Sequence, residues 1–179
     1  MKKQIFSLLF FCATCWLVAQ TKIDTNANEI PAMEQKAAAG HFRQLLSSIV
    51  NNYDATFARC SWQINPDTLY ISGNVTTFFK PTVAGFNSIE FDLTDSLIID
   101  SVIYHNAITT YNQTVPWVLH VNLPSVISIG TLDSVRVIYH GKPANSGFGS
   151  INQTTHSGAP ILWTLSEPFG ARDWWPSKQ

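Results

Sequence analysis

From Tyr53 onward, short apolar stretches alternate with turn-forming residues, a pattern typical of β-structure. The expected strands cover 53–64, 69–79, 88–93, 97–104, 108–111, 117–123, 134–139 and 160–165. Turn signals such as Asn65-Pro66-Asp67 separate them. Many short strands at this spacing predict a mainly β fold, either an antiparallel β-sandwich or a saddle-like curved sheet.

Three local features sharpen this prediction. Tyr53, Ala55 and Phe57 alternate along the first strand, so we expect them on one face. The Ser72-Gly73 pair suggests a β-bulge in the second strand. The stretch 144–158 is rich in Asn, Ser, Gly and Thr and predicts a long surface loop of the kind that can cover a site.

The first 20 residues have the pattern of a secretory signal peptide. Lys2 and Lys3 precede an apolar run over 5–18, and Ala19 or Gln20 offers a cleavage point. The run is shorter than the roughly 20 residues that cross a bilayer as a helix. We therefore expect a secreted or periplasmic protein with no membrane span after cleavage.

A leader over 21–52 separates the signal peptide from the expected β-domain at 53–179. Its first ten residues are polar, and Pro31 suits the first turn of a helix. Within 32–50 the apolar positions fall on one helical face. These positions are Phe42, Leu45, Leu46 and Ile49.

Charge and cysteine content exclude two classes of protein. Removing Lys2 and Lys3 leaves nine basic residues against 12 acids, a net charge of −3, with no basic patch. Nucleic acid is therefore not an expected partner. Cleavage also removes Cys12 and Cys15, so that Cys60 alone remains. We expect it to be a small buried hydrophobe and the domain to lack a disulfide framework.

No familiar catalytic or metal motif occurs in the sequence. There is no H-E-x-x-H, G-x-S-x-G or phosphate-binding glycine loop, and the five histidines lack the spacing of a zinc site. We expect no zinc ligand set within this chain.

Residues 162–178 follow neither a helical nor a strand period, yet they contain acidic, basic and aromatic side chains that could form a binding site. Glu167 precedes Pro168, Arg172 offers a planar fork, and Trp174 and Trp175 form an aromatic wall. A carboxylate beside aromatic walls is a good receptor for a cation. The alternative is a structural corner, in which the tryptophans plug the sheet edge and Arg172 pairs with Glu167 or with Asp173.

The same segment carries a family resemblance. The segment resembles the T-Q-x-E-x-x-x-A-R-x-x-x-P motif of aminopeptidase N-type zinc metallopeptidases, which it matches at Thr164, Glu167, Ala171-Arg172 and Pro176. The residues around the motif resemble a variant found in secreted bacterial members of that family. Weaker matches are I-x-G-x-V-T over 71–76 and V-x-Y-x-G-x-P over 137–143. Leu165 and Ser177 stand where the family often has Gln and Cys.

The resemblance implies that 53–179 is the N-terminal β-domain of such an enzyme. Glu167 would bind the α-ammonium group of a peptide N-terminus, with Arg172, Trp174 and Trp175 supporting the site. In the family, the zinc helix and the catalytic groups lie downstream of this segment. The sequence therefore predicts an incomplete enzyme, inactive alone, whose partner is a downstream catalytic domain with zinc. The alternative is a stand-alone secreted β-sandwich that binds a peptide or a glycan.

Overall fold

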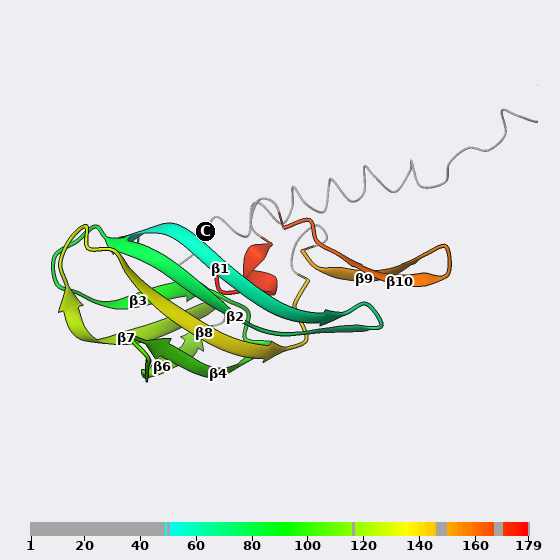
Figure 1. Ribbon diagram of the computed structural model, residues 1–179, viewed down its shortest axis with the longest axis horizontal. Coiled ribbons are helices and arrows are strands. Elements are labelled where there is room, and N and C mark those ends of the chain that lie inside the picture. Colours follow the sequence, from blue (N-terminus) through cyan, green and yellow to red (C-terminus); the bar gives the residue numbers. More distant parts are fainter. Residues whose placement is uncertain (1–48, 50, 116, 146–149, 167–169, 179) are drawn as a thin grey trace, which may run out of the picture. The chain divides into compact units, whose positions relative to one another are not determined.

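The computed structural model describes residue 49 and residues 51–115, 117–145, 150–166 and 170–178, which all belong to one unit spanning 36–179 (Figure 1). The expected signal peptide, nearly all of the expected leader helix, and Glu167 lie outside the described residues. No helix among the described residues is long and apolar enough to cross a membrane.

The domain is mainly β, as the sequence predicts. Its strands are β1 (Tyr53–Asn65), β2 (Thr68–Pro81), β3 (Phe86–Asp92), β4 (Leu97–Tyr104), β5 (Ala107–Ile108), β6 (Tyr111–Val115), β7 (Val118–Ile127), β8 (Asp133–Gly141), β9 (Asn152–His156) and β10 (Ala159–Trp163). A short 3-10 helix, η2 (Ala171–Asp173), follows β10.

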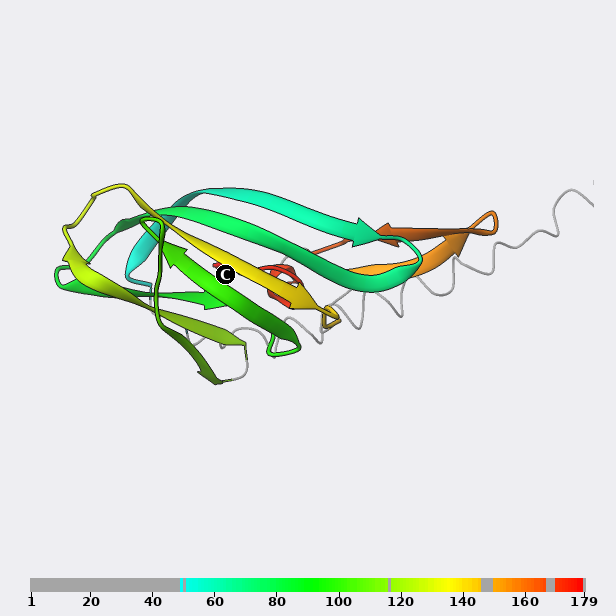
Figure 2. The ribbon, with the colours of Figure 1, turned by 60° about the horizontal axis from the view of Figure 1, so that its bottom comes forward.

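Two antiparallel sheets form the two layers of the domain, which Figure 2 shows from a second side. One sheet has five strands in the order β1-β2-β8-β4-β5, and the other has three in the order β3-β7-β6. Each inward face carries apolar residues at alternate positions, because successive side chains of a strand point to opposite faces. This arrangement confirms the predicted antiparallel sandwich.

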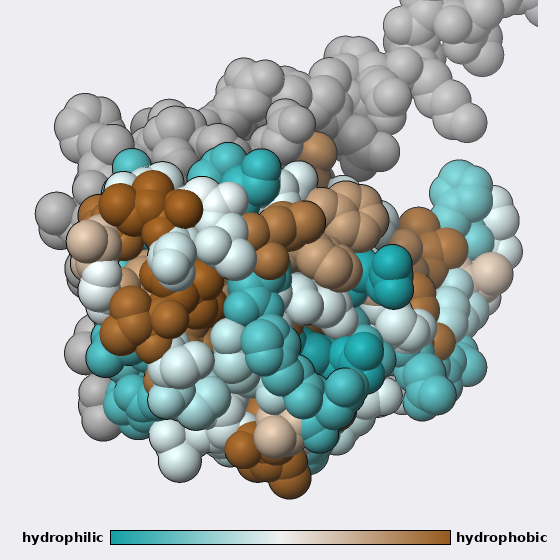
Figure 3. Space-filling view, turned by 60° about the vertical axis from the view of Figure 1, so that its left-hand side comes forward, coloured by the Kyte–Doolittle hydropathy of each residue, from teal (hydrophilic) through white to brown (hydrophobic). Residues whose placement is uncertain are grey.

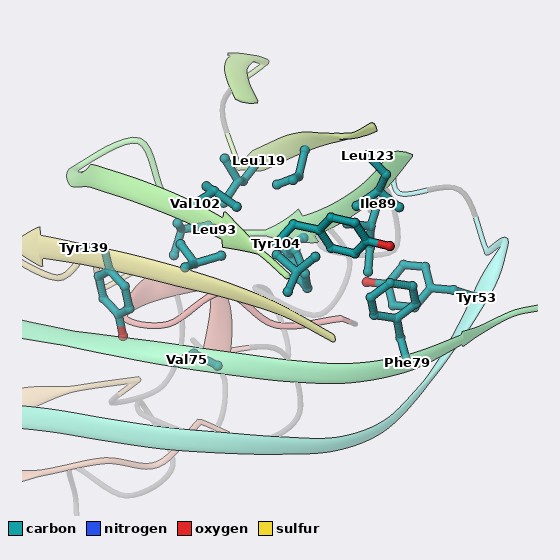
Figure 4. Packing of buried hydrophobic residues seen from close by; sticks show 14 of the residues in the cluster. Tyr53, Val75, Phe79, Ile89, Leu93, Val102, Tyr104, Leu119, Leu123 and Tyr139 are labelled. Carbon is teal, nitrogen blue, oxygen red and sulfur yellow. The ribbon is translucent and has the colours of Figure 1, made fainter. Parts of the chain in front are cut away.

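The core lies between these sheets (Figure 4). At one end of the core, the Tyr53 ring lies with its centroid 5.9 Å from Phe79, 6.2 Å from Phe86 and 6.4 Å from Phe91 in edge-on geometry. The Tyr53 hydroxyl donates a 2.6 Å hydrogen bond to the carbonyl oxygen of Glu90 in β3. One buried tyrosine therefore joins the two layers by packing and by a polar contact.

The bulge lies elsewhere than the sequence suggests. The β1–β2 register shifts between Ala55 and Phe57, which turns Phe57 outward and leaves it 58% exposed. Tyr53 and Phe57 are thus on opposite faces, contrary to expectation. No register shift occurs at Gly73, which pairs regularly with Trp62 in β1 and Tyr139 in β8.

The expected loop over 144–158 is only partly a loop. Its second half forms β9, which pairs with β10 as a separate hairpin. Ser157 and Gly158 at the tip both have positive φ, 51° and 83°, as a two-residue hairpin turn requires. The Gln153 side chain donates a 2.6 Å bond to the carbonyl of Pro66, in the β1–β2 turn.

Candidate functional site

The segment after β10 is fastened to both layers by backbone hydrogen bonds. The carbonyl of Arg172 accepts from the Thr94 amide at 2.8 Å, and the carbonyl of Asp173 accepts from the Ala144 amide at 2.9 Å. Ser177 and Asp92 exchange two bonds, of 2.7 and 3.0 Å. A segment without any sequence period is therefore ordered through its backbone groups.

Three tryptophans join this segment to β1. The rings of Trp62 and Trp174 lie 4.7 Å apart, and Trp175 is 6.4 Å from each of them. All three are partly buried and pack against the core. The Trp174 and Trp175 rings thus pack against Trp62 of β1 and against the core.

A chain of hydrogen bonds, which we call the Trp62–Ser150 chain, runs through this cluster. The Trp62 indole donates to the Tyr139 hydroxyl at 2.8 Å, and that hydroxyl donates to the carbonyl of Trp174 at 2.8 Å. The Trp174 indole donates to the Ser166 hydroxyl at 2.9 Å, which donates to the carbonyl of Ser150 at 3.1 Å. Five residues from β1, β8 and three loops are therefore joined in one network.

Gly73 makes the first link possible. It lies between Trp62 and Tyr139 in the strand register. A Cβ atom at this position would be 2.5 Å from the Ser61 carbonyl oxygen and 2.5 Å from the Trp62 ring. The absent side chain lets the indole cross β2 and reach the tyrosine hydroxyl, so the glycine serves close approach rather than a bulge.

Ser166 and Gly170, the described residues on either side of 167–169, are joined to each other. The Gly170 amide donates to the Ser166 carbonyl at 2.6 Å, which ties together the residues on either side. Gly170 is buried, and a Cβ there would be 2.5 Å from the Ser150 hydroxyl oxygen. We call Ser150, Ser166, Gly170 and Trp174 the frame. The predicted substrate-binding residue, Glu167, follows Ser166 in the sequence and lies outside the described residues.

The Arg172 side chain is partly buried and contacts an aromatic ring. Its guanidinium carbon lies 4.7 Å from the centroid of the Trp117 ring, a cation–π contact. Its Nε atom is buried and has no hydrogen-bond partner among the residues that the structure describes. Trp117 has a φ of 74°, which is rare for a bulky residue, and no sequence signal pointed to it. Asp173, next in sequence, is fully buried.

Burial raises the pKa of two side chains near this segment, the Tyr139 hydroxyl and the Cys60 thiol. It raises the pKa of Tyr139, and the hydrogen bond from Trp62 lowers that pKa to a smaller extent. The hydroxyl is therefore neutral at physiological pH and can both accept and donate. Cys60 is partly buried against the core, and burial raises the pKa of its thiol too, which fits the expected hydrophobic role.

Histidines and acids form pairs rather than a metal centre. His105 lies 2.8 Å from Asp133, and His120 lies 3.2 Å from Glu90. His140 pairs with Asp100 at 2.8 Å. Nowhere in the described part of the chain do three His, Cys, Asp or Glu side chains gather closely enough to hold a metal ion. These residues do not fit a zinc site.

Comparison with known proteins supports the resemblance at the level of fold. No protein-family model matches the sequence, and no curated protein matches it. Among solved structures, an M1 zinc metallopeptidase from Deinococcus radiodurans matches with a TM-score of 0.61 and 23% identity over 72% of this chain. The leukotriene A4 hydrolase of Saccharomyces cerevisiae matches with a TM-score of 0.55 and 14% identity over 70% of this chain.

These matches cover only part of the solved proteins. The chain spans 30% of the bacterial peptidase and 21% of the yeast hydrolase. A variant of an M1 zinc metallopeptidase bound to a Tyr-Ser-Ala substrate matches equally, with a TM-score of 0.61 and 22% identity. At this level of identity the likeness establishes the fold. The β-domain has the fold of the N-terminal domain of aminopeptidase N-type, or M1, zinc metallopeptidases.

Proposed function

We propose that this β-domain borders the substrate cleft of a secreted or periplasmic zinc aminopeptidase, and that Glu167 binds the α-ammonium group of the peptide. The observation that carries the proposal is the frame around residues 167–169. The Gly170 amide donates a hydrogen bond to the Ser166 carbonyl, and the Ser166 hydroxyl bonds in turn to the Ser150 carbonyl and the Trp174 indole. Such a frame suits a loop that must present a carboxylate in one position.

The chemistry follows from charge. A carboxylate near aromatic walls attracts an ammonium group through charge-assisted hydrogen bonds, and a blocked N-terminus offers no such charge. Selection of a free N-terminus would therefore restrict cleavage to the first residue. Arg172 acts beside this loop as a support, because its guanidinium stacks on Trp117 and its carbonyl binds the amide of Thr94.

Zinc belongs to another part of the proposed enzyme. The described residues do not fit a zinc site, and in the family the zinc helix follows this segment. Zinc in such an enzyme supplies an activated water. We propose that a downstream catalytic domain contributes zinc and general base, and that the present chain alone is inactive.

The test is a substitution that removes the charge of Glu167 but keeps the size of its side chain, made in the enzyme encoded by the complete reading frame. Glu167→Gln should raise KM for free peptides about 10- to 100-fold, because an ionic hydrogen bond contributes roughly 1.5–3 kcal/mol. It should also abolish the preference for free over N-acetylated peptides. The matched control is Asp100→Asn, a partly exposed acid in β4 that pairs with His140.

Two outcomes would contradict this role. Unchanged KM and unchanged N-terminal preference in Glu167→Gln would leave the frame as a structural corner. Binding of peptides or glycans by the isolated chain, in the absence of any encoded catalytic domain, would favour the second function, a secreted binding module.

A further inference from the structure

One end of the sandwich carries an apolar surface that the proposed enzyme function does not explain. We call it the end patch, and it consists of Val83, Val126, Ile129 and Leu132, which are 42%, 62%, 60% and 58% exposed. They lie in or beside the β2–β3 and β7–β8 connections. The space-filling view of this side shows hydrophobic side chains gathered there (Figure 3). Single exposed aliphatics are ordinary, but a group of them indicates a covered or binding surface.

The end patch is held together by the backbone. The Gly130 amide donates to the carbonyl of Pro81 at 2.9 Å, which joins the β7–β8 connection to the end of β2. Phe86 pairs with Ile127, which brings the start of β3 beside the end of β7. The four aliphatic residues are therefore carried by fixed, adjacent loops.

The leader enters the domain beside this patch. The carbonyl of Asn52 accepts a 2.9 Å hydrogen bond from the amide of Thr82, the residue before Val83. The Asn51 side chain accepts a 2.7 Å bond from Lys178. Ile49, two residues earlier, is already half-buried.

The leader also carries the complementary surface. Phe42, Leu45, Leu46 and Ile49 fall on one face of the predicted helix, with Gln44 on the opposite face. The 15 residues from 36 to 50 would form a helix about 22 Å long, enough to extend over the end of a two-layer domain.

We propose that the apolar face of residues 42–49 docks on the end patch. The tether at Asn51 and Asn52 keeps the segment beside the patch, so its effective concentration there exceeds that of any separate partner. Docking buries the four aliphatics that would otherwise face water. This inference concerns the leader and is independent of the proposed enzyme activity.

A photocrosslinking experiment on the mature chain 21–179 tests the contact directly. Leu46→p-benzoylphenylalanine should form a crosslink within the same chain. After proteolytic digestion, the crosslinked peptide should contain Val83 or residues 126–132. The matched probe, Gln44→p-benzoylphenylalanine, should give little of that product. An intramolecular crosslink of position 46 to another surface would overturn the proposal, and a crosslinked dimer would replace the leader with a second copy as the occupant.

A substitution pair provides an independent readout. Leu45→Asp combined with Leu46→Asp should increase the binding of a hydrophobic dye several-fold and lower amide protection over 128–132. Gln44→Asp, which adds charge to the polar face, should leave both unchanged. Equal responses of the two variants, or no response in either, would overturn the proposal.

Discussion

The sandwich core and the segment after β10 are ordered in different ways. In the core, Tyr53, Phe79 and their neighbours are buried side chains that fit together by shape. In the segment 170–178, order comes from backbone bonds to Thr94, Ala144 and Asp92, and from the Trp62–Ser150 chain. Packing can tolerate compensating changes, whereas a polar network requires each partner to be present.

This difference suits a domain that must carry a site. The core supplies the free energy of folding, and the polar network holds the described residues on either side of 167–169. We therefore expect core substitutions to lower stability everywhere, and network substitutions to affect mainly the frame around residues 167–169.

The largest effect is expected from the core. Phe79→Ala removes a fully buried ring that contacts Tyr53 and Phe86. It should lower the free energy of unfolding by about 3–5 kcal/mol, through lost burial and a residual cavity. Chemical denaturation followed by circular dichroism measures this, with Phe57→Ala, an exposed ring on β1, as the control. A loss below that of Phe57→Ala would contradict the placement of the core.

Gly73→Ala tests the close approach of Trp62 to Tyr139, the first link of the Trp62–Ser150 chain. The added methyl group would meet the Ser61 carbonyl oxygen at 2.5 Å, and backbone atoms cannot easily move away. We expect a loss of about 1–3 kcal/mol from overpacking, with a change in Trp62 fluorescence. Ser72→Ala, on the neighbouring residue, should change neither quantity. A neutral Gly73→Ala would show that the close approach of Trp62 is not needed.

Tyr139→Phe sharpens the comparison, because it keeps the ring and removes only the hydroxyl. The Trp62 indole then loses its acceptor and the Trp174 carbonyl loses a donor. The expected loss is about 1–3 kcal/mol, from polar groups left unsatisfied. Amide exchange at Gly170 should accelerate more than exchange in the core strands. Uniform acceleration across the domain would mean that the network does not act locally. Tyr70→Phe, at an exposed ring, is the control.

The smallest effect near neutral pH concerns ionisation. Burial raises the pKa of Tyr53, Tyr104 and Tyr139 above its ordinary value of about 10. The folded state thus favours the protonated hydroxyls. Their contribution is complete below pH of about 10 and declines at higher pH, where the unfolded chain ionises first. Denaturation titrations should show constant stability from this source up to that pH and a loss above it. Tyrosinate absorbance well before unfolding that exceeds the contribution of the two exposed tyrosines, Tyr70 and Tyr111, would contradict the burial.

The sheets were predictable because burial leaves a periodic trace in the sequence. Strand positions such as 134–139 carry alternating residues, with Val135, Val137 and Tyr139 on the buried face, that identify both element and face. The register shift after Ala55 left no such trace, so the outward turn of Phe57 was missed. The β9 strand was missed because its side chains are largely exposed and polar, and its hairpin depends on turn geometry rather than on a core-facing stripe.

The candidate site was predictable only in part. Unusual composition drew attention to Arg172, Trp174 and Trp175, and the structure places all three in one fastened segment. The partners Trp62 and Tyr139 come from strands far away in sequence, and no local signal predicts that they meet this segment. Their juxtaposition depends on strand register and on the missing side chain of Gly73.

The most direct test of the central claim, that this domain serves a zinc aminopeptidase, is the nucleotide sequence beyond the codon for Gln179. The account predicts an open reading frame that encodes G-x-M-E-N and then H-E-x-x-H within roughly 200 residues, the size of a further domain. A stop codon with no such frame would contradict it, since Glu167 would then have no catalytic centre beside it.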